Sequence, residues 1–393
     1  MAKTIKVGLV AAPGVSKNVA VHLQDELPDH LAQHVSREVE WEIEVIADPL
    51  TGSAENVTEI FKNISNYQQS YEWEYTIGLT DLPLFTNNKV IAIDVNHDNG
   101  ASLISVPAYG WRPVKKRLRR SIIGVIEEIN KYQPNQHRTN QTEDQDQNQS
   151  SKERLTQQFP LSNLEPHTDY LENTNSKHTR YFVSSRAKGM IRLLSGMTFA
   201  NNPLNMVSSI SNVLAVAFTT GASGIIFTTM WNLSYLYSEL RLLVMMIVSI
   251  LGMMLWIIIA HSLWEPIKHS KDHRITRLYN FTTVTTLTVA LAFYYVLLFV
   301  FFLLATLVVL PSGYLGQSMG LGGSATIVTY INLAWFASSI STVAAAIGAG
   351  LNNAELILES TYGYRQKQRY KLLKQRERER EKEEENAEEK ERS

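Results

Sequence analysis

The stretch LLVMMIVSILGMMLWIIIA, residues 242–260, contains no charged side chain. A bilayer core of ~30 Å requires roughly 20 apolar residues when a helix crosses it. This stretch has about that length, and its apolar side chains would occupy every face of a helix. The sequence therefore predicts a helix whose surroundings are hydrocarbon rather than water.

Three other stretches resemble this one. The predicted spans cover residues 204–230, 242–260, 283–310 and 325–350, and none of them contains Asp, Glu, Lys or Arg. Core helices of this length in water-soluble proteins nearly always carry a polar face, so four apolar stretches in succession favour a membrane domain. We expect an all-α, four-helix transmembrane domain over residues 181–363.

The orientation follows from the basic residues near the predicted spans. They gather before the first span, between the second and third, and after the fourth: Arg186, Lys188, Arg192, Lys268, Lys271, Arg274, Arg277, Arg365, Lys367 and Arg369. The loops after the first and third predicted spans contain a single basic residue, Arg241. The positive-inside rule therefore predicts a multi-pass protein of the cytoplasmic membrane with both termini in the cytosol. The absence of cysteine fits soluble parts that face a reducing compartment.

Residues 1–132 alternate strand and helix patterns. Strands are expected at residues 6–12, 39–46, 75–80, 89–95 and 101–106, and helices at 16–35, 55–68 and 113–131. This alternation predicts a small N-terminal α/β domain on the cytosolic side. Residues 133–180 are dense in Gln, Asn, Ser and acidic residues, which predicts a disordered polar linker. Residues 364–393 predict a charged cytosolic tail.

The α/β domain offers one candidate ligand site. Ser16 would open a helix after the first strand, and helix N-termini attract anions. Asp48, Thr51 and Asp81 follow later strands, and ligands of open α/β sheets bind outside the carboxyl ends of strands. The alternative is that Asp48 and Asp81 only form turns beside Pro49 and Pro83. No dinucleotide-binding or Walker pattern occurs, so the sequence supports nucleotide binding only weakly and leaves the cofactor unknown.

No metal site or catalytic group is predicted either. His22, Glu26, His30 and His34 are spaced by four along one helix face, but the pattern lacks the Glu of H-E-x-x-H. A solvated helix face explains that spacing. No Ser–His–Asp arrangement or carboxylate pair is evident from the spacing of the chain's residues.

A basic cluster opens the helix at 113–131. It consists of Lys115, Lys116, Arg117, Arg119 and Arg120. Such a cluster can rest on anionic lipid headgroups at about 1 kcal/mol per cation. The formal net charge of the whole chain is −1 and no domain is strongly basic, so nucleic acid is not an expected partner.

The fourth predicted span carries small residues at four-residue spacing, namely Ala337, Ser341, Ala345 and Ala349. Small side chains let two helix backbones approach closely, so this face predicts tight helix packing. The partner helix can belong to the same chain or to a second copy, which makes a homo-oligomer possible. Hydroxyl groups in the first and fourth spans favour either helix–helix hydrogen bonds or a polar path between helices.

The chain resembles a group of uncharacterised bacterial membrane proteins, common in Gram-positive lineages. The similar segments are GLV at 8–10, PG at 13–14, DPLTG at 48–52, LTDLPL at 79–84, SVPAYG at 105–110, GM at 196–197, NP at 202–203, LWE at 263–265, YN at 279–280, TT at 282–283 and GAG at 348–350 before Tyr362. The resemblance implies a small N-terminal α/β domain joined to four membrane helices. Some members are labelled methylenetetrahydrofolate dehydrogenases. This chain departs from the pattern at Asn352 and Asn353, where similar chains tend to carry an acidic residue.

Together these patterns predict a cytosolic ligand-sensing or ligand-binding domain on a membrane unit, with a transport, channel-like or envelope accessory role. The alternative is a membrane-anchored enzyme that acts on a small anionic metabolite near Ser16, Asp48 and Asp81. A protein that only binds a partner protein is a third possibility.

Overall fold

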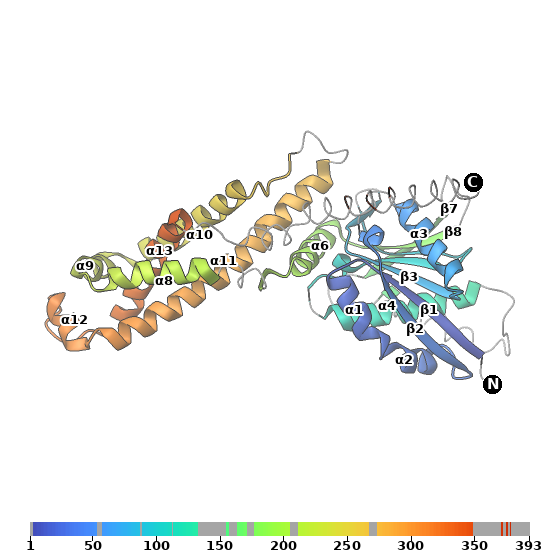
Figure 1. The fold of residues 1–393 in the computed structure, drawn as a ribbon, viewed down its shortest axis with the longest axis horizontal. Coiled ribbons are helices and arrows are strands. Elements are labelled where there is room, and N and C mark those ends of the chain that lie inside the picture. The colour runs from blue at the N-terminus through green and yellow to red at the C-terminus, as the bar shows by residue number, and fades with distance from the viewer. Residues whose placement is uncertain are drawn as a thin grey trace, which may run out of the picture. The chain divides into compact units, whose positions relative to one another are not determined.

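The computed structural model describes residues 3–52, 57–86, 89–111, 113–132, 155–156, 163–170, 177–204, 211–266 and 273–348, with the single residues 371, 375 and 378. The charged tail at 364–393 therefore lies almost entirely outside the described residues. The boundary between two compact units falls after Ala200. The first unit is an α/β sheet domain and the second is helical, which confirms the two expected parts of the fold (Figure 1).

A parallel sheet forms the centre of the first unit. Its strands β1 (Lys3–Ala11), β2 (Val39–Ala47), β3 (Tyr75–Thr80) and β6 (Ala101–Ser105) lie in the order β2-β1-β3-β6. The connections from β1 to β2 and from β2 to β3 run in opposite directions across the sheet. Because such crossovers are right-handed, their helices must lie on opposite faces.

Helices cover the two faces as this rule requires. Helices α1 (Val15–Gln24), α2 (Leu27–His34) and α4 (Val114–Tyr132) contact one another on one face, and α3 (Val57–Ser70) packs on the other (Figure 1). The expected single helix at 16–35 is wrong, since the helix is interrupted at Asp25 and Glu26 and continues as a second helix. Pro28 lacks a backbone N–H, so it fits the first turn of a new helix but not a helix interior.

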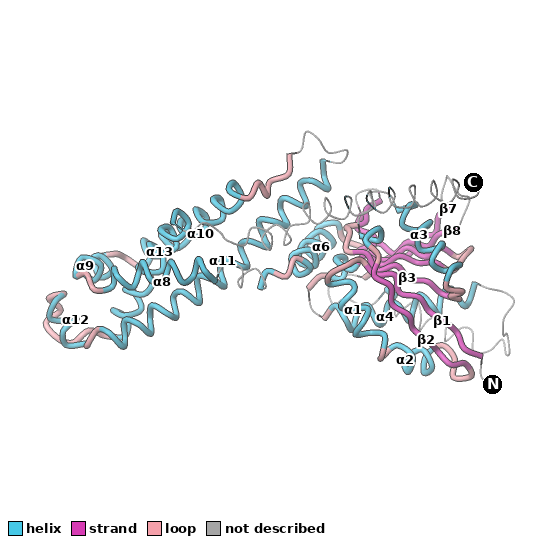
Figure 2. Tube along the Cα trace, viewed as in Figure 1, coloured by secondary structure: helices cyan, strands magenta, loops and turns pink. Residues whose placement is uncertain are grey.

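Antiparallel strands extend the sheet beyond β6. Strand β5 (Lys89–Asn96) pairs with β6 as the expected hairpin, and β4 (Leu84–Thr86) and β8 (Lys177–Val183) pair with β5. Strand β7 (Leu164–Tyr170) pairs with β8 at the edge, as Figure 2 shows in magenta. The expected disordered linker at 133–180 is therefore wrong for β7 and for the first residues of β8. The physical reason is that β5 offers β8 a backbone hydrogen-bonding edge, and β8 in turn pairs with β7. The rest of that linker, except residues 155–156 and Asn163, lies outside the described residues.

A further helix, α6 (Arg186–Ala200), belongs to the first unit and packs on the short helix η2 (Val106–Tyr109). Gly196 makes this approach possible, because a Cβ there would lie 2.1 Å from the carbonyl oxygen of Pro107. The expected start of the membrane domain at 181 is therefore too early. Residues 181–200 complete the α/β unit instead.

The second unit contains α8 (Ser211–Ile225), α9 (Thr228–Leu236), α10 (Glu239–Ala260), α11 (His273–Val309), α12 (Ser312–Ser318) and α13 (Ile327–Gly348). Among the described residues, α10, α11 and α13 are long and apolar enough to cross a membrane, and α8 with α9 would make a fourth span if the bent pair counts as one. Helix α11 begins well before the predicted 283, because the charge-free criterion excluded its basic first turns.

The predicted single helix at 204–230 is wrong. Helix α8 ends at Ile225 and α9 leaves it at an angle of 94°. Gly224 lies next to this break, and glycine weakens a helix interior. The indole N–H of Trp231 donates to the carbonyl oxygen of Ile225, which satisfies an acceptor that the interrupted helix leaves open.

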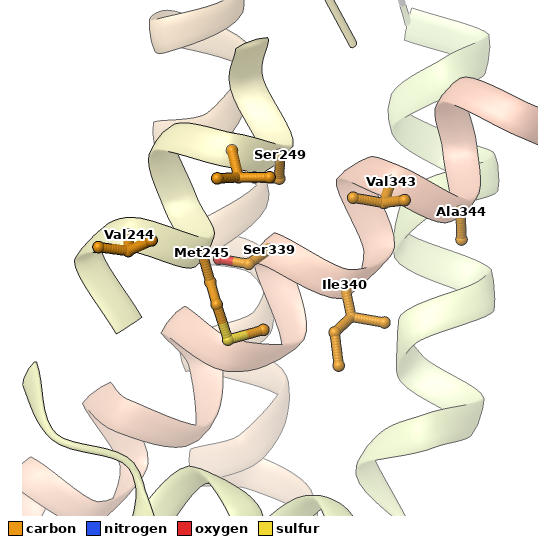
Figure 3. Close-up of a pocket in the computed structure, with 8 residues that line it drawn as sticks. Val244, Met245, Ser249, Ser339, Ile340, Val343 and Ala344 are labelled. Carbon is orange, nitrogen blue, oxygen red and sulfur yellow. The ribbon is translucent and has the colours of Figure 1, made fainter. Parts of the chain in front are cut away.

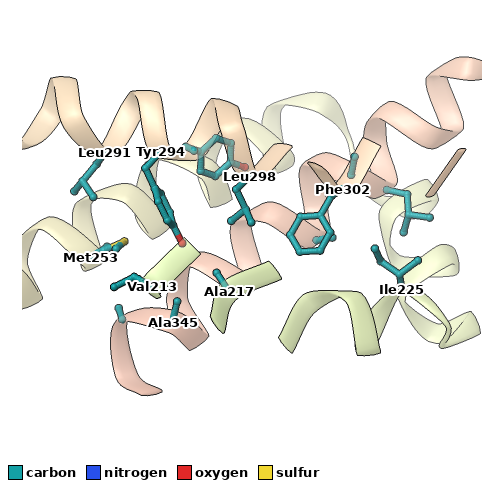
Figure 4. Packing of buried hydrophobic residues seen from close by; sticks show 14 of the residues in the cluster. Val213, Ala217, Ile225, Met253, Leu291, Tyr294, Leu298, Phe302 and Ala345 are labelled. Atoms are coloured by element: carbon teal, nitrogen blue, oxygen red, sulfur yellow. The ribbon is translucent and has the colours of Figure 1, made fainter. Parts of the chain in front are cut away.

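The second unit places apolar side chains on its outside and hydroxyl groups inside. Val308 is 83% exposed and Ile259 is 65% exposed, and other large apolar residues of α10 and α11 are exposed as well. The buried polar residues include Ser249, Thr306, Ser338, Ser341 and Thr342. Figure 4 shows the apolar cluster between the helices, with Tyr294, Leu298 and Phe302 from α11 close to Ala217 from α8.

Candidate functional site

The strand order places a topological switch point between β1 and β3. The chain leaves β1 toward one side of the sheet and leaves β3 toward the other. Ligands of open α/β sheets bind outside the carboxyl ends of the strands at such a point. Backbone bonds hold this edge together, because Ala12 N–H donates to the Leu79 carbonyl at 2.9 Å and Asp48 N–H donates to the Ala11 carbonyl at 3.0 Å. The turn after β1, Asp48 and Asp81 therefore share one edge of the sheet.

Two hydroxyl groups at this edge are buried without a hydrogen-bond partner. Ser16 is the second residue of α1, and Thr51 lies in the short helix η1 (Pro49–Gly52). Both residues are 0% exposed, and neither Ser16 Oγ nor Thr51 Oγ1 has a hydrogen-bond partner. A buried hydroxyl without a partner costs about 1–3 kcal/mol.

The two carboxylates are buried as well. Asp48 is 3% exposed and accepts a hydrogen bond from the Asn63 side chain of α3, so it links the end of β2 to that helix. Asp81 is 3% exposed. The next residues are held by Thr80 Oγ1, which accepts from Leu82 N–H at 3.1 Å, and by Ser105 Oγ, which donates to the Leu82 carbonyl at 2.7 Å. The carboxylates thus shape the edge, and the two hydroxyls are its open hydrogen-bonding groups.

The basic cluster of α4 does not form one continuous cationic surface. Lys115 and Arg119 both bind the Glu26 carboxylate, with 2.9 Å between Arg119 Nη1 and Glu26 Oε2. The hydrogen bond from Lys115 lowers the pKa of Glu26, and Arg119 adds to the effect. Arg117 donates to a backbone carbonyl. Of the cluster, only Lys116 and Arg120 are exposed.

A polar cluster that the sequence did not reveal lies between β5 and β8. Asp94 is 1% exposed and accepts from His178 Nδ1 at 2.8 Å and from Arg180 Nε at 3.0 Å. Phe61 of α3 meets the His178 ring edge-on. The sequence signal was misread, because His178 and Arg180 fall inside the segment expected to be disordered.

His97 lies at the end of β5. Its Nε2 contacts Thr179 Oγ1 at 2.7 Å and lies 3.7 Å from a carboxylate oxygen of Glu128. Burial lowers the pKa of His97 to about 4, with the nearby positive charge of Lys177 as the next cause. Within the described part of the chain, no three His, Cys, Asp or Glu side chains gather as metal ligands.

In the second unit, the small residues of α13 face other helices of the same chain. Ala337, Ser341 and Ala345 are at most 1% exposed, whereas Ala349 lies outside the described residues. A Cβ on Gly221 of α8 would lie 2.0 Å from Ser341 Oγ, so α8 and α13 are in close contact. This face is used within the chain, and a homo-oligomer would need another surface.

A shallow groove of about 420 Å³ lies between α10 and α13. Apolar side chains such as Val244, Met245 and Ile340 line it, together with the hydroxyl-bearing Ser249 and Ser339 (Figure 3). Ser339 Oγ is already bonded to the hydroxyl of Tyr295 at 2.7 Å. The groove therefore offers apolar surface with little free hydrogen-bonding capacity.

Comparisons with known proteins do not place the chain in a family. No protein-family model matches it, and no curated protein matches it. The crystal structure of archaemetzincin from Methanopyrus kandleri is similar over part of the chain, with a TM-score of 0.27 and 15% identity across 32% of this chain and 73% of that chain. A likeness of that size carries no argument about fold or function.

Proposed function

We propose that this chain is a multi-pass protein of the cytoplasmic membrane whose α/β domain binds a small ligand in the cytosol. The observation that supports membrane insertion is the outward-facing apolar surface of α10 and α11. Exposed apolar area in water costs about 25 cal/mol per Å². Large exposed side chains on successive helix turns, such as Val244, Val248 and Leu251, are therefore compatible with lipid and unfavourable in water.

The ends of the helical unit support the orientation. The connection between α10 and α11 carries the basic residues, which favours the cytosol. The short helices α9 and α12 lie together at the other end, where Trp231 and Tyr314 contact each other with ring centroids 5.8 Å apart. Aromatic side chains prefer the membrane–water interface. We place this end on the outer side of the membrane.

The chain has no cysteine, so single introduced cysteines report topology cleanly. Ser324→Cys lies between α12 and α13, and Ser262→Cys lies just after α10; both serines are exposed. A membrane-impermeant maleimide should label Cys at 324 in intact cells, and Cys at 262 only after the membrane is opened. Labelling of both in intact cells, or extraction of the protein by alkaline carbonate without detergent, would refute the proposal.

The ligand-binding part of the proposal rests on the two buried hydroxyls at the switch point. A ligand that accepts hydrogen bonds from Ser16 and Thr51 would remove their desolvation cost, which couples binding to stability. No side chain caps the start of α1, and helix N-termini favour an anionic acceptor. The same position supports the alternative, an enzyme that acts on a small anionic metabolite.

A thermal-shift screen of the full-length protein in detergent tests the site with nucleotides, folates and carboxylates. A true ligand should raise the melting temperature of the wild type, and Thr51→Val should abolish the shift because valine keeps the shape and removes the hydroxyl. Ser70→Ala, at the exposed end of α3, is the matched control and should respond as the wild type does. A ligand that stabilises all three proteins equally would bind elsewhere. Turnover of the stabilising ligand would favour the enzyme, and binding without turnover would favour a sensor.

A further inference from the structure

Helix α6 carries apolar residues on two of its faces. One face is buried and consists of Gly189, Leu193, Gly196, Met197 and Ala200. The other, which we call the open face, consists of Ala187, Met190, Ile191 and Leu194, spaced as i, i+3, i+4 and i+7. Met190 is 44% exposed and Ile191 is 69% exposed. Single exposed apolar residues are ordinary, but a row at helical spacing is typical of a surface that meets an apolar environment.

Basic side chains and a tryptophan border the open face. Arg186 and Lys188 are exposed, and at 3.6 residues per turn they lie on either side of the apolar row. Helix α6 contains no acidic residue. Trp111 is 60% exposed and follows Gly110, where a Cβ would lie 2.8 Å from the Arg192 Cγ of α6. Helices that lie on membrane surfaces combine aliphatic residues and tryptophan with Lys and Arg in this way.

The chain holds α6 close to the proposed membrane-spanning helices. Ala200 ends α6, and the helical unit begins at the next residue, Asn201. The Asn201 side chain donates from Nδ2 to Thr286 Oγ1 at 2.9 Å. Thr286 lies near the start of the charge-free stretch of α11, which is the cytosolic end in the proposed orientation. The 15 residues of α6 span about 22 Å, so the open face starts within that distance of the bilayer edge.

We propose that the open face of α6 lies on the cytosolic leaflet of the membrane and binds anionic lipid there. This proposal rests on the membrane insertion and orientation proposed above, and it is independent of Ser16 and Thr51. Such a helix buries its apolar row about 5–10 Å into the boundary between headgroups and acyl chains. The cations beside the row then meet lipid phosphate groups, and Trp111 lies at the membrane–water interface. The α/β domain is thus held to the membrane by α6 and not by the basic cluster of α4.

The chain has no cysteine, so one introduced cysteine can carry an environment-sensitive fluorophore at a chosen position. Ile191→Cys reports on the open face, and Ala187→Cys repeats the measurement with Ile191 intact. Val21→Cys, at an exposed apolar position of α1, is the matched control. Full-length protein is placed in nanodiscs of phosphatidylcholine and phosphatidylglycerol, with and without bromine on the acyl chains. Contact with bromine should quench the probes at 191 and 187 and leave the probe at 21 bright.

Removal of charge tests whether anionic lipid is the partner. Each cation near an anionic surface changes the docking equilibrium roughly fivefold, so Arg186→Gln with Lys188→Gln should weaken docking roughly 25-fold. Quenching at 191 should then fall to the level seen in nanodiscs of phosphatidylcholine alone. Lys116→Gln with Arg120→Gln removes two exposed cations of α4 and should leave the quenching unchanged.

Three results would overturn the inference. The probe at 191 can be quenched by iodide in the water and not by lipid bromine, which leaves the open face in solvent. Neither quencher can reach it, which means that protein covers the face. Equal bromine quenching at 191 and 21 would show that α6 is not the docking face. Leu251→Cys, at an exposed position of α10, separates this failure from failure of the membrane proposal, since bromine quenches that probe whenever the helical unit lies in the bilayer.

Discussion

Replacement of His97 by glutamine should remove a specific part of the pH dependence of stability. Unfolded histidine takes up a proton near pH 6.5, whereas His97 in the folded protein does so at about 4. Between these values the unfolded chain binds more protons, so the folded state loses stability as the pH falls. From pH 7 to pH 5 this one group should cost about 2 kcal/mol, and at most about 3 kcal/mol below pH 4.

The size of the effect depends on what faces the ring. Burial disfavours the imidazolium, and the charges of Lys177 and His178 act in the same direction, while Asp94 and Asp98 oppose them. Glutamine can keep the hydrogen bond that His97 makes to Thr179 Oγ1. The substitution therefore removes the proton-binding group and leaves the local contact available, which isolates protonation as the cause.

The assay is urea unfolding of the full-length protein in detergent, followed by tryptophan fluorescence at pH 7, 6 and 5. Amide hydrogen exchange of β5 and β8 adds a local readout. Wild type and His97→Gln should be similar at pH 7, and the wild type should fall behind by about 2 kcal/mol at pH 5. If both proteins lose stability in parallel, protonation of His97 is not the source and the argument from burial is wrong.

Three further changes test packing and charge. Gly221→Ala brings a Cβ within 2.0 Å of Ser341 Oγ and should destabilise the helical unit by about 1–3 kcal/mol in detergent melting curves; Gly252→Ala, with nothing within 4 Å, is the control and should be neutral or stabilising. Gly8→Ala places a Cβ 1.8 Å from the Trp73 ring and should lower the melting temperature of the α/β domain with a change in tryptophan fluorescence. Glu26→Gln should lower the melting temperature slightly at pH 7, and this difference should shrink as the pH falls below 4.5, because the ion pairs stabilise the fold only while the carboxylate is ionised and its pKa is lowered from that value.

The local sequence pattern was sufficient to predict an element wherever the surroundings of the segment, apolar or aqueous, decide its structure. Helix α10 covers the predicted span at 242–260, because a segment that is apolar on every face is compatible only with an apolar environment. Strand β3 matches its predicted bounds because an apolar run of that length, closed by Asp81 and Pro83, suits a buried parallel strand. The candidate residues Ser16, Asp48, Thr51 and Asp81 could be placed at one edge because chain direction alternates predictably in an α/β domain.

The local sequence pattern could not predict which distant residues and strands contact each other. Asp94 binds His178 across 84 positions of the sequence, and no spacing rule connects them. Strands β7 and β8 were missed because their composition is polar, while they are held by backbone bonds, from β8 to the distant β5 and from β7 to β8.

The same limit applies to charge and to small side chains. The sequence predicted Lys115 and Arg119 to be part of a membrane-binding patch, but in the folded domain both form ion pairs with Glu26. The small residues of α13 indicated close packing, but only the arrangement of α8 against Ser341 shows that the partner is in the same chain. A sequence pattern indicates whether a side chain suits water or an apolar environment. Which group that side chain contacts depends on how distant segments pack, and this packing forms only when the chain folds.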